Sequence, residues 1–430
     1  MGLGRDILYA TGALAASPIW GASLLRTGKW RTDWPGKFGR TGGDLPPDPG
    51  VKTLLIHGVS VGEISLIRNL VKQLETVPNL RLVIATTTNT GFARATALYA
   101  PRHRVVRFPF DFSFAVRRFL DSLGPDAVAL VELEVWPNFM DACTRRGLPV
   151  AVINGRLTER SYRGYRRIAP LIRPAFRQLA AAAVQTPAYA QRFRDIGVPA
   201  DRVRVLDTMK WDTAVIEDAV DGSEALAEAM HIDPQRPLIV AGSTAPGEER
   251  LLIDACPSDA QVLLAPRKPE WFEAVLKHAP HAVRRTAPPV RPPVLNPDQK
   301  HVFLLDTIGE LRVAYSLADI CVIGRSFTGE LYGSDMMEPI ALGKPTVIGP
   351  HHADFAQTMA ALKEAGGIVV AEDPADAIQE LLQNASRAAE LAEAGRRVIL
   401  SHQGATAHHA TLLLDLLGLP PGPNVTPNPI

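Results

Sequence analysis

Short apolar runs alternate with longer segments of helical periodicity through most of the chain. Uninterrupted Val, Ile and Leu runs predict buried strands, and apolar residues three and four positions apart predict helices. In the first half the predicted strands are Thr53–His57, Arg81–Thr86, Val105–Phe108, Ala127–Val131, Val150–Asn154, Ala181–Gln185 and Val203–Leu206. Helices are predicted between them, for example over Gly91–Tyr99 and Phe114–Leu123. This alternation is typical of a parallel sheet with helices on both faces.

A second series of strands follows a weaker, acidic stretch between Asp212 and Pro237. Its predicted strands are Pro237–Ala241, Gln261–Ala265, Val302–Leu305, Ile320–Ile323, Thr346–Ile348 and Gly367–Val370. Residues 277–300 are rich in proline and predict a surface loop. The last predicted helices are Pro374–Gln383, Ala385–Leu400 and Ala405–Leu417. We therefore expect an α/β protein with two doubly wound, Rossmann-like parallel-sheet domains that face each other across a cleft.

The length of 430 residues is sufficient for two domains with separate cores. We predict an apolar segment over residues 1–34, a first domain over 35–218 and a second over 219–402. A C-terminal helix and a tail, disordered from residue 420, are predicted over residues 403–430.

Composition excludes several classes of function. Lys and Arg number 46 and Asp and Glu 45, so no nucleic-acid partner is indicated. Cys143, Cys256 and Cys321 stand singly, which favours a reducing compartment and gives neither a disulfide framework nor a zinc site.

The N-terminus carries no charge from Ile7 to Leu25 and is followed by Arg26, Lys29, Arg31, Lys37 and Arg40. The uncharged stretch is just long enough to cross a bilayer, but Pro18 and several small residues weaken it as a span. We expect an interfacial helix whose basic collar attracts anionic lipid headgroups and leaves the rest of the chain in the cytoplasm. A helix buried against the first domain is the alternative.

The joint between the first strand and the first helix places Ser60, Gly62 and Glu63 at the carboxyl edge of the sheet, where open α/β folds bind ligands. Ser60 and Glu63 have the spacing of a capping box, in which each satisfies a backbone N–H of the other. Glu63 could instead be a general base that takes a proton from an attacking hydroxyl. Spacing alone favours the cap.

Loops in the second half predict an anion site. Ala241-Gly242-Ser243-Thr244 follows a predicted strand, and Pro246-Gly247-Glu248-Glu249 then opens a helix. Small residues there let backbone N–H groups approach a phosphate. Arg267 offers a planar fork to such an anion. Thr307 and Glu310 have the spacing of a second capping box.

Together these motifs resemble the 3-deoxy-D-manno-octulosonic acid (Kdo) transferases, glycosyltransferase family 30 with the GT-B fold. The resemblance covers nearly the whole chain. It is carried by HGVSVGE (57–63), ATTTNTGFARA (85–95), ELEVWPN (132–138), NGRLTERSYRGY (154–165), KWD (210–212), GSTAPGEE (242–249), PRKPE (266–270), DTIGEL (306–311), the stretch from Glu338-Pro339 to Gly343-Lys344-Pro345, and GPHHADF (349–355).

The resemblance implies an inverting transferase that moves Kdo from CMP-Kdo to a lipid A precursor at the cytoplasmic face of the inner membrane, with neither a metal nor a cofactor. It places Glu63 on the catalytic base and raises that interpretation above the cap, with Ser60 and Gly62 shaping the loop. Acceptor-side positions fall on Glu132, Trp136 and Arg156. CMP-binding positions fall on Ser243, Pro266, Arg267, Thr307, Gly309, Glu310 and Glu338.

The donor side departs from the family pattern at several positions. Where the family usually has Gly-Gly-His/Gln-Asn-x-x-Glu, this chain has Ser334 and Asp335 before Glu338. A charged Asp335 would repel the nucleotide phosphate, and Lys268 could offset that charge. Ala245 stands where the family has His. The alternatives are therefore a GT-B transferase for another nucleotide sugar or membrane acceptor, or a degenerate, non-catalytic homologue.

Overall fold

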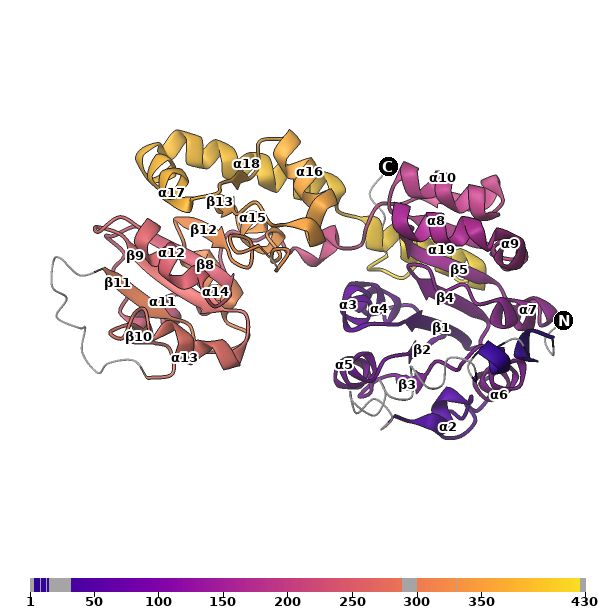
Figure 1. Cartoon of the computed structure of the whole chain (residues 1–430). Helices are drawn as coiled ribbons and strands as arrows, with labels where there is room; N and C mark the ends of the chain where they lie inside the picture. The colour runs from indigo at the N-terminus through magenta and orange to yellow at the C-terminus, as the bar shows by residue number, and fades with distance from the viewer. Residues whose placement is uncertain are drawn as a thin grey trace. The chain divides into compact units, whose positions relative to one another are not determined.

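The structure is a computed structural model that describes residues 4–7, 9–12, 14, 32–287, 300–329 and 331–425. The chain forms two compact units (Figure 1). The first comprises Met1–Thr213 and Gln403–Ile430, and the second comprises Ala214–His402. The C-terminal segment is thus part of the first unit and not a separate element.

The first unit is built on a sheet that has seven parallel strands in the described residues, in the order β3-β2-β1-β4-β5-β6-β7. The strands are β1 (Lys52–Gly58), β2 (Leu80–Thr86), β3 (Arg104–Arg107), β4 (Ala127–Val131), β5 (Val150–Gly155), β6 (Ala181–Val184) and β7 (Val203–Val205). Its helices are α2 (Trp34–Lys37), α3 (Val61–Leu66), α4 (Arg68–Leu74), α5 (Asn89–Tyr99), α6 (Ser113–Leu123), α7 (Pro137–Arg145), α8 (Glu159–Arg167), α9 (Ala169–Arg177), α10 (Pro187–Ile196) and α19 (Ala405–Leu417).

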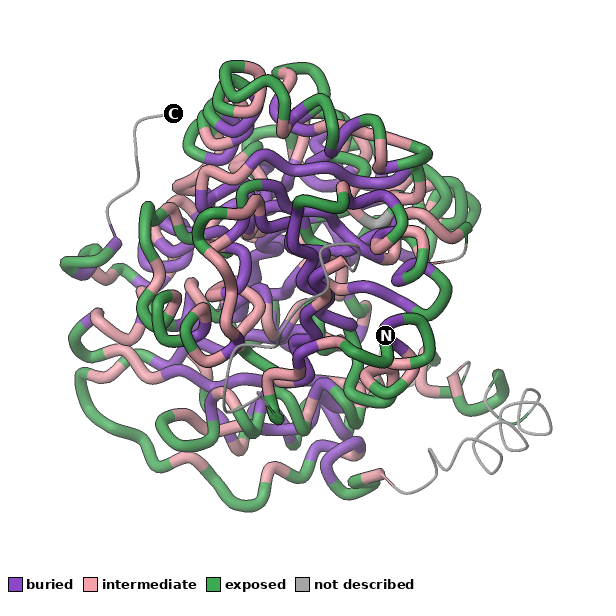
Figure 2. The backbone as a smooth tube through the Cα atoms, turned by 90° about the vertical axis from the view of Figure 1, so that its left-hand side faces the viewer, coloured by how far each residue is buried: buried purple, intermediate pink, exposed green. Residues whose placement is uncertain are grey.

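Successive side chains of the central strands point alternately into two hydrophobic cores, one on each face of this sheet. Leu55 and Val128 point toward α6, α7, α9 and α10, and Leu54, Ile56 and Ala129 point toward α3, α4, α5 and α19. Burial on both faces explains why the strands are apolar without interruption. Figure 2 shows buried residues (purple) mainly in the interior and exposed residues (green) mainly on the outside.

The second unit repeats this architecture with seven parallel strands in the order β10-β11-β9-β8-β12-β13-β14 among the residues described. They are β8 (Leu238–Thr244), β9 (Gln261–Pro266), β10 (Val283–Arg284), β11 (His301–Leu304), β12 (Ile320–Ile323), β13 (Thr346–Ile348) and β14 (Val369–Val370). The helices are α11 (Ser223–Met230), α12 (Glu248–Ala255), α13 (Phe272–Val275), α14 (Leu311–Leu317), α15 (Met337–Ala341), α16 (Ala356–Glu364), α17 (Pro374–Gln383) and α18 (Ala385–His402).

Helix α19 closes one face of the first sheet (yellow in Figure 1). The carboxylate of Asp212 caps its N-terminus, because its oxygens accept the N–H groups of Gly404 at 2.7 Å and Thr406 at 2.6 Å. Val425 is 2 % exposed and packs against the same core. Disorder was therefore the wrong prediction for residues 420–425, and residues 426–430 lie outside the described part.

Described residues 4–7, 9–12 and 14 are helical and contact the first unit. Arg5 forms a 2.6 Å ion pair with Asp141, and Tyr9 donates to Asp111 at 3.1 Å. Most of the predicted apolar segment, residues 15–31, lies outside the described residues. Within the described ranges, no helix combines the length and apolar character needed to cross a membrane.

Candidate active site

The side chains predicted for the acceptor side lie at the carboxyl edge of the first sheet. The strand order reverses between β1 and β4, and ligands of open α/β sheets bind at such a switch point. Glu63 follows β1, Glu132 follows β4 and Arg156 follows β5. The fold therefore brings residues from three separate motifs to one edge.

The carboxylate of Glu63 is held by its own loop. Its Oε1 accepts a 2.8 Å hydrogen bond from the Ser60 hydroxyl, and its Oε2 accepts the Val59 N–H at 2.8 Å. Ser60 is the N-cap of α3, and its Oγ accepts the Glu63 N–H at 3.3 Å. The Ser60 half of the predicted capping box therefore forms. The Glu63 carboxylate accepts the hydroxyl group of Ser60 instead of its backbone N–H. The general-base role stays a prediction.

Gly62 is exposed in the first turn of α3. A Cβ there would come no closer than 3.7 Å to another group, the hydroxyl of Ser60. No close contact in the loop requires a glycine at this position.

Glu132 is a second carboxylate within electrostatic reach of Glu63. Burial raises the pKa of Glu132 and the charge of Glu63 raises it further, while Arg156 and Lys210 lower it. Its backbone has a φ of +63°, a left-handed conformation that a non-glycine residue adopts at a cost. Such strain is concentrated at functional sites, and here it turns the chain sharply at the end of β4.

Glu134 and His57 complete the cluster and were missed as site residues. Burial raises the pKa of Glu134, and the Trp136 indole opposes that shift by donating to Oε2 at 3.0 Å. Oε2 also lies 4.0 Å from Nε2 of His57. Both residues lie in motifs that the sequence analysis quotes. His57 is in β1 and Glu134 follows β4, and these strands are neighbours only because of the strand order in the sheet, which the motifs do not reveal.

His57 is fully buried, with its ring stacked on Phe108 at a centroid distance of 3.6 Å. Burial lowers the pKa of His57 to about 3, so the ring is neutral at neutral pH. Nδ1 lies 3.2 Å from the carbonyl oxygen of Ala85, which can only accept, so Nδ1 carries the proton. Nε2 therefore presents its lone pair toward Glu134.

Lys37 does not belong to a basic collar, contrary to the sequence-based expectation. It is buried; its ammonium donates to the Thr87 carbonyl and lies 5.4 Å from the centroid of the Phe110 ring. Burial lowers the pKa of Lys37 to about 8. It is a buried cation behind the carboxyl edge and cannot reach lipid headgroups.

The residues predicted to bind the donor lie at or after the carboxyl ends of strands in the second sheet. Ser243 lies in β8, Pro266 ends β9, and the Thr307 loop and the Ser334–Glu338 segment follow β11 and β12. This sheet reverses its strand order between β8 and β12. Both units therefore place the predicted residues around a switch point.

The loop after β8 does not present the free amide cradle that the sequence predicted. The N–H of Ala245 donates to Glu248 at 3.0 Å, and the N–H of Gly247 donates to Glu249 at 3.1 Å. Both carboxylates belong to the first turn of α12 and are buried. Protein carboxylates thus occupy the positions at which an anion was expected.

Arg267 is exposed directly after β9, and its backbone N–H donates to Thr244 at 3.0 Å. This bond fixes the end of β9 beside the end of β8 and leaves the guanidinium at the sheet edge. The Nζ atom of Lys268 lies 3.7 Å from Oε1 of Glu270 and 4.8 Å from the ring centroid of Trp271.

The second predicted capping box was wrong. Helix α14 begins at Leu311, so Glu310 is its N-cap and not its third residue. The Glu310 carboxylate accepts from the Thr307 hydroxyl and forms a 2.9 Å ion pair with Arg285. Burial would raise the pKa of Glu310, but these partners outweigh it and lower the pKa. Gly309 has a φ of +100°, which glycine adopts readily.

The segment that departs from the family pattern is partly buried. Ser334 is buried and its Oγ has no hydrogen-bond partner among the described residues, whereas Asp335 is exposed and accepts the Met337 N–H at 2.9 Å. Burial raises the pKa of Glu338 and the charge of Asp335 raises it further, while Arg312 opposes both. The charge of Asp335 thus acts on Glu338, one of the residues predicted to bind CMP.

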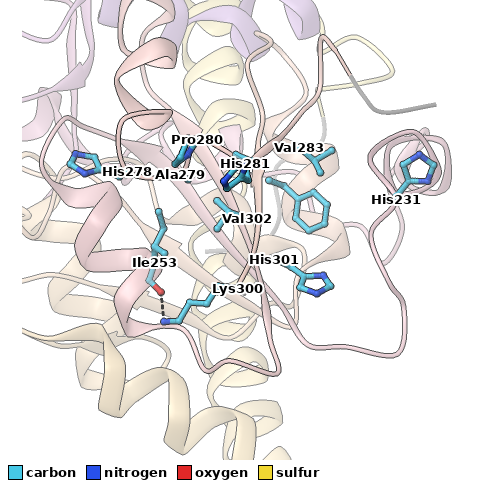
Figure 3. A pocket seen from close by; sticks show the side chains of 12 residues that line it. His231, Ile253, His278, Ala279, Pro280, His281, Val283, Lys300, His301 and Val302 are labelled. Atoms are coloured by element: carbon cyan, nitrogen blue, oxygen red, sulfur yellow. Dashed lines mark hydrogen bonds between the residues drawn. The ribbon is translucent and has the colours of Figure 1, made fainter. Parts of the chain in front are cut away.

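A cavity of about 270 Å³ in the second unit lies away from these residues (Figure 3). His301 and Val283 contribute from the amino ends of β11 and β10, and Lys300 donates to the Ile253 carbonyl at 2.6 Å at the end of α12. None of the predicted site residues lines it. The described residues contain no group of three or more His, Cys, Asp or Glu that could hold a metal ion.

Residues 32–213 match the family model described as 3-deoxy-D-manno-octulosonic-acid transferase (kdotransferase). The 3-deoxy-D-manno-octulosonic acid transferase of Bordetella pertussis is 30% identical over 420 residues, which cover 93% of this chain and 95% of that protein. The enzyme of the same name from Haemophilus influenzae is 28% identical and covers 86% of this chain and 87% of its own length.

Solved structures show the same fold. A glycosyltransferase of Rickettsia africae aligns with a TM-score of 0.56 at 11% identity, over 85% of this chain and 99% of that one. The UDP-GlcNAc 2-epimerase of Neisseria meningitidis aligns with a TM-score of 0.55 at 12% identity, over the same shares of the two chains. The prediction of a two-domain α/β, GT-B fold is confirmed.

Proposed function

The chain belongs to the Kdo transferase family, and on that premise we propose that it transfers Kdo from CMP-Kdo to a lipid A precursor with inversion at the anomeric carbon. The observation that carries this proposal is the carboxylate cluster of Glu63, Glu132 and Glu134 at the switch point of the first sheet. A transferase that attacks with a sugar hydroxyl needs a positioned proton acceptor there.

Glu63 is the proposed base. The acceptor hydroxyl replaces the Ser60 hydroxyl at Oε1 and gives its proton to that oxygen while its own oxygen bonds to the anomeric carbon. The bond from the anomeric carbon to the CMP phosphate breaks in the same step, and CMP leaves with the electron pair of that bond. The second oxygen keeps the Val59 N–H, which fixes the carboxylate in position. A positioned base contributes about 10²–10⁴-fold to the rate. Arg156 and Lys210, which offset charge at Glu132, are the proposed contacts to an anionic acceptor.

On the donor side, Arg267 is the proposed partner of the departing phosphate, in a mechanism without a metal ion or cofactor. It is exposed at the end of β9, where the guanidinium can pair with two phosphate oxygens. Glu338 is the proposed partner of the ribose. Ser243, near the end of β8, and Ser334 and Gly309, on neighbouring loops, lie at the same edge.

We also propose that the protein acts at the cytoplasmic face of the inner membrane. Besides the apolar N-terminal segment, the consecutive helices α8 and α9 support this. Helix α8 has no buried residue and exposes Arg160, Arg163, Arg166 and Arg167. Ile168 and Leu171 beside them are 47% and 64% exposed. Arginines around exposed apolar side chains suit an anionic lipid surface.

The test is release of CMP from CMP-Kdo by purified protein, with and without the acceptor lipid. Wild type should release CMP only with acceptor, and Glu63→Gln should lose turnover by about 10²-fold or more while it still binds CMP. Near-normal turnover of Glu63→Gln would show that another carboxylate is the base.

A second candidate is a GT-B transferase for a different nucleotide sugar, favoured by the charge of Asp335 beside Glu338. A thermal-shift panel of CMP, UDP and GDP sugars separates the two. Stabilisation by a UDP sugar and not by CMP would reject the first proposal. Absence of both binding and turnover in the folded protein would indicate the degenerate homologue.

A further inference from the structure

The side chain of Glu248 joins two loops that are far apart in the sequence. Oε1 accepts the N–H groups of Ser326 at 2.9 Å and Phe327 at 3.0 Å. Oε2 accepts those of Arg325 at 2.6 Å and Ala245 at 3.0 Å. The residue is 0% exposed, and its carboxylate is the shared acceptor for four backbone donors.

The two loops lie on either side of the switch point, since Ala245 follows β8 and Arg325 follows β12. The backbones approach so closely there that a Cβ on Gly324 would lie 2.5 Å from the Cα of Thr244. Arg325 has a φ of +60°, a conformation that its own side chain disfavours. A strained loop of this kind needs an external brace, and the carboxylate of Glu248 supplies it.

The brace extends to the residues predicted to contact the donor. The carbonyl of Arg325 accepts the N–H of Gly333 at 2.8 Å, which precedes Ser334 and Asp335. The hydroxyl of Ser326 accepts the N–H of Gly349 at 2.8 Å, at the end of β13. Through these two links, Glu248 sets the positions of three loops at one edge.

We propose that Glu248 is a positioning residue for the nucleotide-sugar site, which holds the Arg325–Phe327 loop and through it the Ser334–Glu338 segment in the form that binds the donor. This rests on the proposed function, in which that edge takes CMP-Kdo. Glu248 itself does not touch the donor, because its lone pairs are used within the protein.

Glu249 provides a matched control. It is the next residue of α12 and is 1% exposed, but the hydrogen bonds that its carboxylate accepts from described residues come from Gly247 and Thr244, within its own loop. Glu248→Gln and Glu249→Gln therefore make the same replacement at nearly the same depth, and only the first removes acceptors from the loop after β12. An amide nitrogen facing backbone donors leaves at least one of them unpaired.

The experiment compares both variants with wild type by amide hydrogen exchange, CMP titration and steady-state kinetics. Glu248→Gln should speed exchange at residues 325–327, weaken CMP binding by about tenfold and raise the donor KM without changing the acceptor KM. Glu249→Gln should leave exchange at 325–327 and CMP affinity within about twofold. Equal behaviour of the two variants would overturn the proposal.

If Glu248→Gln does not fold, Ser326→Ala tests the next link of the same brace. It should speed exchange at Gly349 and weaken CMP binding, and wild-type values for both would overturn the proposal. The exchange measurement needs no ligand. Failure of wild type to bind CMP would therefore reject the proposed donor, while the exchange data still decide whether Glu248 holds the loop.

Discussion

The hydroxyl of Ser60 donates a 2.8 Å hydrogen bond to Oε1 of Glu63 and also caps helix α3. The side chain of Ser60 thus stabilises the helix and also hydrogen-bonds the Glu63 oxygen that is proposed to receive a proton. The two interpretations of Glu63, as a cap and as a base, therefore describe successive states of one carboxylate in the proposed reaction.

Ser60→Ala should separate these roles. Loss of the cap should lower the free energy of unfolding by about 1 kcal/mol, measured by urea denaturation. Thr186→Ala, which removes the cap of α10, should cost a similar amount. Only Ser60→Ala should also change kcat, because Ser60, unlike Thr186, donates a hydrogen bond to Glu63. Equal kcat in the two variants would contradict this.

Stability should fall in acid because of His57. Its pKa drops from about 6.5 in the unfolded chain to about 3 in the folded protein, so the unfolded chain binds the extra proton first. Stability from this group is complete above pH 6.5 and declines as the pH falls toward 3, by about 1.4 kcal/mol per pH unit.

The measurement is urea denaturation of wild type and His57→Gln at pH 7, 6, 5 and 4. His57→Gln should flatten the profile below pH 6.5, whereas His281→Gln, at an exposed position, should not. Parallel profiles for wild type and His57→Gln would show that the ring is not held neutral.

Asp335→Asn should strengthen nucleotide binding. The change removes a negative charge beside Glu338 and keeps the Oδ1 that accepts the Met337 N–H. We expect CMP affinity, measured by calorimetry, to rise about threefold to tenfold at low salt and less at high salt. Asp376→Asn, an equal change of charge on exposed α17, should have no effect. Weaker binding by Asp335→Asn would instead mean that this carboxylate contacts the donor.

Reversing charge on α8 should release the protein from anionic vesicles. Each arginine near such a surface contributes about 1 kcal/mol, so the double variant Arg160→Glu, Arg167→Glu should bind at least about tenfold more weakly in co-sedimentation. Arg204→Glu, on the edge strand β7, is the control. If the control weakens binding as much, net charge and not this helix governs the association.

Local sequence predicted those elements whose determinants are local. The strands Ala127–Val131, Ile320–Ile323 and Thr346–Ile348 appear with the expected bounds, because a strand buried on both faces must be apolar throughout. Strand β10 has two residues and lies inside the predicted surface loop, too short to give a pattern. The break between α3 and α4 at Ile67 has no Gly or Pro to announce it.

The candidate site shows the same division. Motifs placed Glu63, Glu132 and Arg267 at sheet edges because a strand end is readable from the sequence. Three of the four partners of Glu248 lie 77 to 79 residues away on the loop after β12. The ion-pair partner of Glu310 is Arg285, directly after strand β10, which was not predicted. Such pairings depend on the order of strands in the sheet, which periodicity does not encode.

The return of α19 to the first unit also sets an order of events during synthesis. Leu412, Leu413 and Leu414 belong to the hydrophobic core between the first sheet and helices α3, α4, α5 and α19. They nevertheless leave the ribosome after residues 214–402. The half of the chain that is translated first is therefore the half completed last, and part of one face of its sheet stays uncovered until α19 has been synthesised.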